Sequence, residues 1–209
     1  MDNIRRLYHS LYPGYLREFL RELKGIDSIL DVGCGANSPL QYVNKSGRRV
    51  GLDGFAPSIE KAKQKGIHTQ YLEADFRDMS TLFNKNEFEC VLANDVIEHL
   101  TRDEGFNLLD TIENIASKKV IIFTPVGFVP QRSFDRNDLQ EHLSGWEVED
   151  FYARGYRVRG INGLAALRGE RAAIKHKPEI LFSCVSWASQ FYTFSRPKKA
   201  YAQFCVLEK

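Results

Sequence analysis

The sequence of 209 residues is poor in cysteine, and its four cysteines lie far apart. Cys34, Cys90, Cys184 and Cys205 form no Cys-x-x-Cys motif, and no cluster of histidines accompanies them. A disulfide framework or a zinc site normally shows such close spacing in the sequence. We therefore expect neither a disulfide-stabilised fold nor a metal site.

Long apolar runs and an excess of one charge are also missing. No stretch reaches the about 18 consecutive apolar residues of a membrane-spanning helix, and the N-terminal residues contain no apolar segment of a secretory signal. The net charge of +2 provides no strongly basic stripe of the kind that nucleic-acid-binding proteins carry. These absences predict a cytoplasmic protein without a nucleic-acid partner, and the length suits one α/β domain with its own core.

Residues 28–37, Ser-Ile-Leu-Asp-Val-Gly-Cys-Gly-Ala-Asn, join a buried strand pattern to a glycine turn. Gly33 and Gly35 have no Cβ atom, so the backbone can turn sharply there and approach a ligand closely. Ser38 and Pro39 follow as a suitable N-cap and first helical residue. A strand, a glycine turn and a helix N-terminus in this order predict a nucleotide-type pocket.

Three later apolar runs also end in polar residues. The second run ends in Asp53, an acid about twenty residues after the glycine turn, where a carboxylate can accept hydrogen bonds from ribose hydroxyls. The third run, residues 67–72, leads into Asp75 and Phe76, an acid beside an aromatic ring that suits an adenine base. The fourth run ends in Asn94. Because parallel strands end at one edge of a sheet, these residues predict a single crevice there.

Apolar periodicity predicts that strands and helices alternate along the rest of the chain. Residues 4–23 carry two short helices separated by a Pro-Gly pair, and Thr101 caps a helix that runs to about Ala116. Residues 156–158 form a short sixth strand, and residues 200–207 form the last strand.

With these motifs the chain resembles the class I S-adenosylmethionine-dependent methyltransferases, in particular their small-molecule, type 11/12-like branch. Asp31–Asn37 matches the first family motif, with Asn37 in place of the third glycine. Asp53 matches the ribose-binding acid, whereas Gly54 stands where the family usually has a bulkier residue. Residues 94–100, Asn-Asp-Val-Ile-Glu-His-Leu, resemble the fourth motif. The resemblance runs continuously over about residues 25–160.

The resemblance implies a Rossmann-like three-layer αβα sandwich around a seven-stranded, mostly parallel sheet whose last strand is antiparallel. A nicotinamide-binding domain is the alternative, but it would favour glycine at position 38 and would need a further substrate domain. The implied cofactor is S-adenosyl-L-methionine. The residues implied to bind it are Asp31, Gly33, Cys34, Gly35, Asp53, Gly54, Asp75, Phe76, Asn94 and Asp95.

His99 and His142 are the candidate catalytic bases. Methyl transfer needs in-line attack of a nucleophile on the methyl group of the sulfonium, with a base where the nucleophile is neutral. Imidazole titrates near neutrality, and His99 directly follows an acid at the pocket end of the fourth strand. A helix-capping role for His99 and a backbone-bonded loop role for His142 are the alternatives. We expect Asp95 and Glu98 to cap a helix or to contact the residues that line the site.

We expect residues 1–209 to form one methyltransferase domain. Residues 1–24, which carry three tyrosines, form a possible lid, and residues 127–146 plus 161–195 form a possible substrate-side cap. We expect residues 127–146 to serve the acceptor and not the cofactor.

The methyl acceptor is an unidentified small molecule, and the sequence leaves the oligomeric state open. One alternative is a lipophilic acceptor at a membrane surface, because residues 178–194 predict an amphipathic helix with basic flanks. We expect the apolar stripe of that helix to pack on the protein's own domain. The other alternative is a non-catalytic protein that keeps the cofactor fold for binding a partner.

Overall fold

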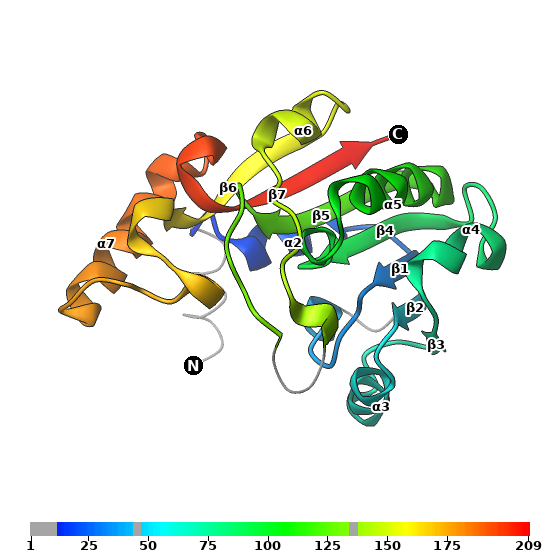
Figure 1. The fold of residues 1–209 in the computed structure, drawn as a ribbon. Helices are drawn as coiled ribbons and strands as arrows, with labels where there is room; N and C mark the ends of the chain where they lie inside the picture. Colours follow the sequence, from blue (N-terminus) through cyan, green and yellow to red (C-terminus); the bar gives the residue numbers. More distant parts are fainter. Residues whose placement is uncertain (1–11, 44–46, 134–137) are drawn as a thin grey trace.

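A computed structural model describes residues 12–43, 47–133 and 138–209. Seven strands form one sheet in the order β3-β2-β1-β4-β5-β7-β6, and β7 runs antiparallel to both of its neighbours (Figure 1). This topology confirms the predicted fold class. The strands are β1 Ser28–Val32, β2 Arg48–Asp53, β3 Gln70–Glu73, β4 Phe88–Asn94, β5 Ala116–Pro125, β6 Arg157–Leu164 and β7 Ala200–Glu208.

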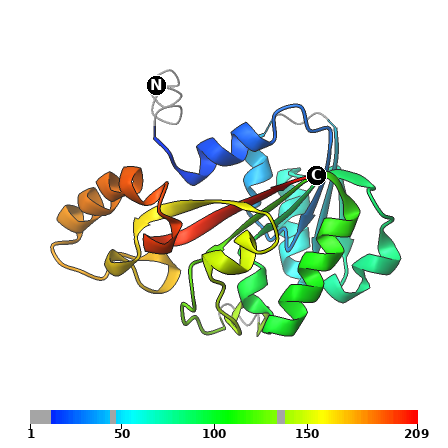
Figure 2. The same ribbon diagram turned by 90° about the horizontal axis from the view of Figure 1, so that it is seen from above.

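Helices cover both faces of the sheet, with α2 on one side and α5 on the other (Figure 2). Each face has its own apolar cluster, one including Phe19 of α2 and the other including Leu109 and Ile112 of α5. The α-helices are α2 Tyr15–Glu22, α3 Ala56–Lys65, α4 Met79–Leu82, α5 Arg102–Ile115, α6 Val148–Tyr152 and α7 Glu179–Thr193. Short 3-10 turns span Pro39–Tyr42, Phe76–Asp78, Ile97–His99, Asp138–Gln140, Ala165–Leu167, Glu170–Ala172 and Pro197–Lys199.

The boundaries of α5 and β7 follow the sequence prediction closely. Thr101 caps α5 through a capping box, in which its side chain and that of Glu104 each accept from the other's backbone N–H. The third strand starts at Gln70, later than predicted. The first of the two predicted N-terminal helices lies outside the described residues, and α2 is the second.

Two predicted elements have different lengths in the structure. The helix expected after Ser38 is a single 3-10 turn, although Ser38 does cap it by accepting from the Leu40 N–H. Strand β6 is longer than predicted because β7 pairs with it along Arg157–Ile161. Its register then shifts at Asn162 and Gly163, whose φ angles are +68° and +70°.

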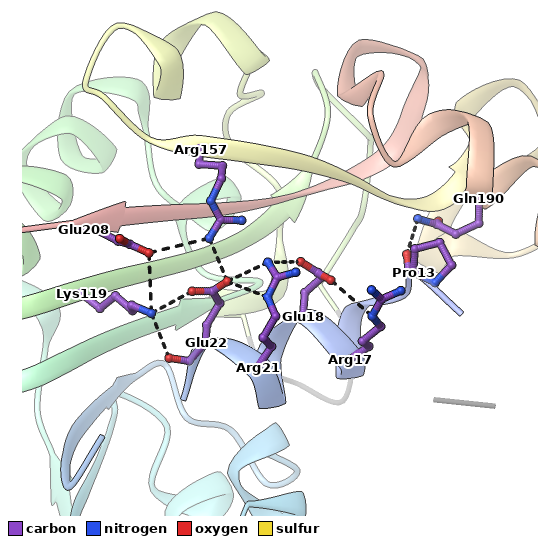
Figure 3. Close-up of polar contacts among 9 residues, drawn as sticks. All are labelled: Pro13, Arg17, Glu18, Arg21, Glu22, Lys119, Arg157, Gln190 and Glu208. Atoms are coloured by element: carbon purple, nitrogen blue, oxygen red, sulfur yellow. Dashed lines mark hydrogen bonds and ion pairs between the residues drawn. The ribbon is translucent and has the colours of Figure 1, made fainter. Parts of the chain in front are cut away.

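An ion-pair cluster attaches α2 to the sheet (Figure 3). The carboxylate of Glu22 accepts from Lys119 of β5 at 2.8 Å, from Arg157 of β6 at 2.8 Å and from the adjacent Arg21 at 2.9 Å. Burial alone would raise the pKa of Glu22, but these hydrogen bonds lower it to about 2. The cluster therefore holds α2 against one face of the sheet.

Helix α7 packs on β6 through its polar face, contrary to the sequence expectation. Ser186, Gln190 and Thr193 are buried, whereas the apolar stripe faces away from β6, with Leu181 55% exposed and Phe191 54% exposed beside the Tyr12 ring. The reason is the short distance between the two backbones. A Cβ atom on Gly163 would lie 2.3 Å from the Ser186 carbonyl oxygen, and Gln190 on this face of α7 accepts from the Gly163 N–H and donates to the Gly160 carbonyl.

Candidate active site

A cavity of about 880 Å³ lies at the carboxyl ends of the central strands. Eight predicted site residues line it: Asp31, Gly33, Cys34, Gly35, Asn94, Asp95, His99 and His142. The other four, Asp53, Gly54, Asp75 and Phe76, are not part of its wall. The fold therefore brings the glycine turn and both histidines to one cavity, as the motif order implied.

The glycine turn needs its glycines for conformation and for space. Gly33 and Gly35 have φ angles of +61° and +55°, which glycine adopts without strain. A Cβ atom on Gly33 would also lie 2.5 Å from Cγ2 of Val96. Between the glycines, burial and nearby carboxylates raise the pKa of the Cys34 thiol, so this side chain is an inert part of the wall.

Asp53 is connected to the turn although it lies outside the cavity wall. Its two carboxylate oxygens accept from the backbone N–H groups of Gly35 and Phe55, each at 2.8 Å. These bonds fix the carboxylate and leave further lone pairs for hydroxyl groups. Leu139 lies 3.4 Å from the position of a Cβ atom on Gly54, so the connection after β5 reaches the residue next to Asp53.

Asp31 is already engaged within the protein. It is almost fully buried, and one of its oxygens contacts Ser38 Oγ at 2.5 Å and His68 Nε2 at 2.8 Å. Sequence reasoning missed His68, since no local pattern connects it with the first motif. The Ser38 contact joins the strand end to the turn that follows it, and Asp31 also lines the cavity.

Asn94 presents an unsatisfied donor at the cavity wall. Its Oδ1 accepts from the Tyr15 hydroxyl of α2 at 3.1 Å, whereas its buried Nδ2 has no hydrogen-bond partner in the described part of the chain. Buried polar groups are nearly always paired, so this N–H group suits a polar ligand atom. Tyr15 also lines the cavity, which shows how α2 reaches the site.

Asp75 and Phe76 form a small surface structure beyond the cavity wall. The Asp75 side chain accepts from the Arg77 N–H at 2.9 Å and so caps the turn that follows. The Arg77 guanidinium lies 5.4 Å from the centre of the Phe76 ring. Their predicted contact with adenine remains a prediction.

Glu98, His99 and His142 meet at the other end of the cavity. One potential ligand atom from each lies within 4.8 Å of the others, although His142 follows β5 and the other two follow β4. Burial lowers the pKa of both imidazoles, so both rings are neutral at pH 7. Burial raises the pKa of Glu98, and the nearby Asp95 carboxylate raises it further.

Both segments predicted as a substrate-side cap contribute to the wall. Gln131, Gln140 and His142 come from the connection after β5, Asn162 comes from β6, and Arg171 comes from the region between β6 and α7. Their role in recognising an acceptor stays a prediction.

Comparison with known proteins agrees with this geometry. Residues 30–122 match a family model described as a methyltransferase domain. Ubiquinone biosynthesis O-methyltransferase from Rhodopseudomonas palustris is 30% identical over 131 residues, which are 58% of this chain and 47% of that protein. Probable tRNA methyltransferase 9B from Homo sapiens is 26% identical over 110 residues, 48% of this chain and 23% of that protein. The chain thus spans less than half the length of these relatives.

Solved structures extend the likeness over the whole chain. A SAM-dependent methyltransferase from Archaeoglobus fulgidus aligns with a TM-score of 0.59 and 13% identity, covering 98% of this chain and 99% of that one. Magnesium protoporphyrin IX methyltransferase from Synechocystis PCC 6803, with bound SAM, aligns with a TM-score of 0.54 and 15% identity. The alignment covers 100% of this chain and 82% of that one. At these identities the structures establish the fold, and together with the family match they confirm the resemblance drawn from the sequence motifs.

Proposed function

We propose that this protein, a member of the class I S-adenosylmethionine-dependent methyltransferases of the type 11 branch, transfers the cofactor's methyl group to a small molecule. The observation that carries the proposal is the continuous cavity, which runs from the glycine turn to Glu98, His99 and His142. The glycine turn would hold the cofactor, and the histidines would contact an acceptor in the same cavity. Binding both reactants in one cavity supplies the alignment that in-line transfer requires.

The described residues fit S-adenosylmethionine. Asp53 has free lone pairs for the ribose hydroxyls, and Asn94 Nδ2 is an unpaired donor for a polar cofactor atom. Gly33 and Gly35 both line the cavity, and the space beside Gly35 is open for close approach. When bound, the cofactor supplies an electrophilic methyl group on a positively charged sulfur.

His99 and His142 are the residues that act on the acceptor in this proposal. Their rings are neutral and partly exposed to the cavity, so they can take up a proton from an acceptor hydroxyl or amine. The acceptor's lone pair would then be free to form the bond to the methyl carbon, with the electron pair of the broken carbon–sulfur bond left on sulfur.

Titration calorimetry with S-adenosylmethionine tests the proposal. We expect one site per chain in the parent protein and no measurable binding to Gly33→Val, because the new side chain would collide with Val96 and occupy the turn. Gly169→Val is the matched control, since its nearest neighbour is 4.0 Å from a Cβ atom and its φ is not positive. A parent protein without heat of binding would instead support the non-catalytic alternative.

A cytoplasmic location and a small-molecule partner, with no nucleic acid, belong to the same proposal. The absence of a nucleic-acid partner is supported by the net charge of +2, and the small-molecule partner is supported by a cavity of about 880 Å³. Within the described residues, no helix has the length and apolar character needed to cross a membrane.

A second candidate is methyl transfer to a lipophilic acceptor at an anionic membrane surface. The outward apolar face of α7 favours it, with Leu181 55% exposed and Phe191 54% exposed. Basic residues flank this face and would attract anionic lipids, namely Lys175, Lys177, Arg196, Lys198 and Lys199.

Vesicle sedimentation tests the second candidate. We expect binding to phosphatidylcholine vesicles that contain phosphatidylglycerol, and loss of binding in Leu181→Ser/Phe191→Ser. Leu82→Ser, at an exposed position on α4, is the control. Vesicle binding by the double variant would contradict this candidate. So would a concentration-dependent dimer of the parent protein that the double variant no longer forms.

A further inference from the structure

We propose that Arg171 and Tyr201 bind a carboxylate group of the methyl acceptor, so that the acceptor is an anionic small molecule. The inference rests on the proposed function, because it specifies the acceptor of the same cavity. Among the described residues that line the cavity, Arg171 alone carries a permanent positive charge. The N–H of Ala172, the next residue, donates to the Tyr201 hydroxyl oxygen at 3.0 Å, so both side chains belong to one part of the wall.

A strained turn places Arg171 at the cavity. Arg171 and Ala172 have φ angles of +54° and +58°, a left-handed conformation that residues other than glycine seldom adopt. The Arg168 guanidinium holds the turn, since it donates to the Ala172 carbonyl at 2.5 Å and to the Asn162 carbonyl at 2.6 Å. Strain that the surrounding structure maintains in this way is typical of residues in binding sites.

Tyr201 supplies a neutral donor beside this turn. Burial raises the pKa of its hydroxyl, and the nearby Asp95 and Glu98 carboxylates raise it further, so the group stays protonated. Its oxygen accepts from the Ala172 N–H, whereas its own proton has no acceptor within the described ranges. An oxygen atom of a ligand in the cavity can therefore accept from it.

The turn lies at the acceptor end of the cavity. Burial lowers the pKa of the His142 imidazole, while its hydrogen bond to Val129 and the charge of Glu170 act in the opposite direction. Glu170 directly precedes Arg171, so the turn lies near His142. A molecule whose carboxylate is held by Arg171 would thus also reach the imidazole proposed to act on the acceptor.

The donors and charges of the wall favour a carboxylate over a phosphate. The planar guanidinium matches the two oxygens of a carboxylate, and the tyrosine hydroxyl adds a neutral donor. Asp31, Asp95 and Glu98 also line the cavity and would repel an anion, so Arg171 has to offset them. A phosphate monoester, with a charge of about −1.5 to −2, would need further cations. The acceptor would then combine a carboxylate with a nucleophilic hydroxyl or amine.

Nuclear magnetic resonance titrations with matched acids and amides test this inference. The probes are 4-hydroxybenzoate, 3,4-dihydroxybenzoate and 3-hydroxybutanoate, each paired with its primary amide and added in the presence of excess S-adenosylhomocysteine. We expect at least one acid to bind the parent protein about tenfold or more tightly than its amide does, a difference of about 1.4 kcal/mol.

Three variants identify the groups responsible. Arg171→Gln removes the charge and should bring the affinities for acid and amide to within about twofold of each other. Tyr201→Phe removes only the hydroxyl and should weaken binding of the acid by about three- to tenfold. Lys175→Gln removes an exposed charge of the same segment that lies outside the cavity wall, and it should leave binding of the acid unchanged.

Titration of the same samples with S-adenosylmethionine separates this inference from the proposed function and shows that the variants are folded. Equal binding of acids and amides, no binding of any acid, or a preference that Arg171→Gln retains would overturn the inference. A large loss of S-adenosylmethionine affinity in Arg171→Gln would also overturn it, because Arg171 would then bind the cofactor's own carboxylate. An acid preference that depends on Arg171, in a parent protein that does not bind S-adenosylmethionine, would refute only the proposed function.

Discussion

At the scale of single residues, Asp53 illustrates how backbone groups prepare a side chain for binding. The N–H groups of Gly35 and Phe55 hold both of its oxygens, so the carboxylate cannot rotate away from the turn. Because those bonds are made without a ligand, a cofactor finds the acid already oriented, which lowers the entropic cost of binding.

We predict that Asp53→Ala weakens S-adenosylmethionine binding by about 10- to 150-fold. Loss of a charge-assisted contact to the ribose corresponds to about 1.5–3 kcal/mol. Calorimetry measures the change, with Asp103→Ala, an exposed acid on α5 outside the cavity wall, as the control. Equal affinities of the parent protein and Asp53→Ala would show that Asp53 does not contact the cofactor.

At the scale of elements, the attachment of α2 should depend on pH through Glu22. The pKa of Glu22 is lowered to about 2 from an ordinary value of 4.5, so the unfolded state binds its proton first on acidification. The stabilisation is therefore complete above about pH 4.5 and is lost as the pH falls toward about 2.

We predict that Glu22→Gln lowers the free energy of unfolding at pH 7 by about 1.5–3 kcal/mol, the range for hydrogen bonds to charged groups. Urea denaturation of both proteins between pH 2 and 7 measures the difference, which should shrink below pH 4.5. If the difference in the free energy of unfolding stayed constant between pH 2 and 7, the charge of Glu22 would contribute nothing to stability.

The contact between α7 and β6 depends on a glycine at their closest approach. Gly163 has φ +70°, and its N–H donates to Gln190 Oε1 at 2.9 Å. We predict that Gly163→Ala lowers the free energy of unfolding by about 2–4 kcal/mol, through backbone strain and collision with Ser186.

Gly169→Ala is the matched control for this prediction, because a Cβ atom there meets nothing closer than 4.0 Å. Urea denaturation should show a small change for it, within about 0.5 kcal/mol. If Gly163→Ala and Gly169→Ala had equal free energies of unfolding, the close packing of α7 on β6 would not contribute to stability.

At the scale of the whole molecule, binding should stabilise the fold because the cavity is built from β1, β4 and the segments that cover them. A ligand at 100 times its dissociation constant adds about 2.7 kcal/mol. We therefore predict that S-adenosylmethionine at this excess raises the melting temperature by about 5–10 °C. Thermal denaturation with and without the cofactor measures this shift, and an unchanged melting temperature would argue against a site formed only in the folded protein.

Local patterns in the sequence predicted individual strands and helix caps, and the family resemblance implied how the strands assemble. The buried strand before Gly33, the capping residue Thr101 and the last strand each act over a few neighbouring positions, so they can be identified without tertiary contacts. The family match and the strand order agree with them.

Contacts between distant segments were decided only by the tertiary structure. His68 lies beside Asp31, and His142 lies beside Glu98 and His99, because strand order places their segments together. The orientation of α7 likewise depends on the small distance from Gly163, which its own apolar pattern does not encode. Periodicity specifies which side of a helix is apolar, but the neighbouring backbone determines which side can be buried.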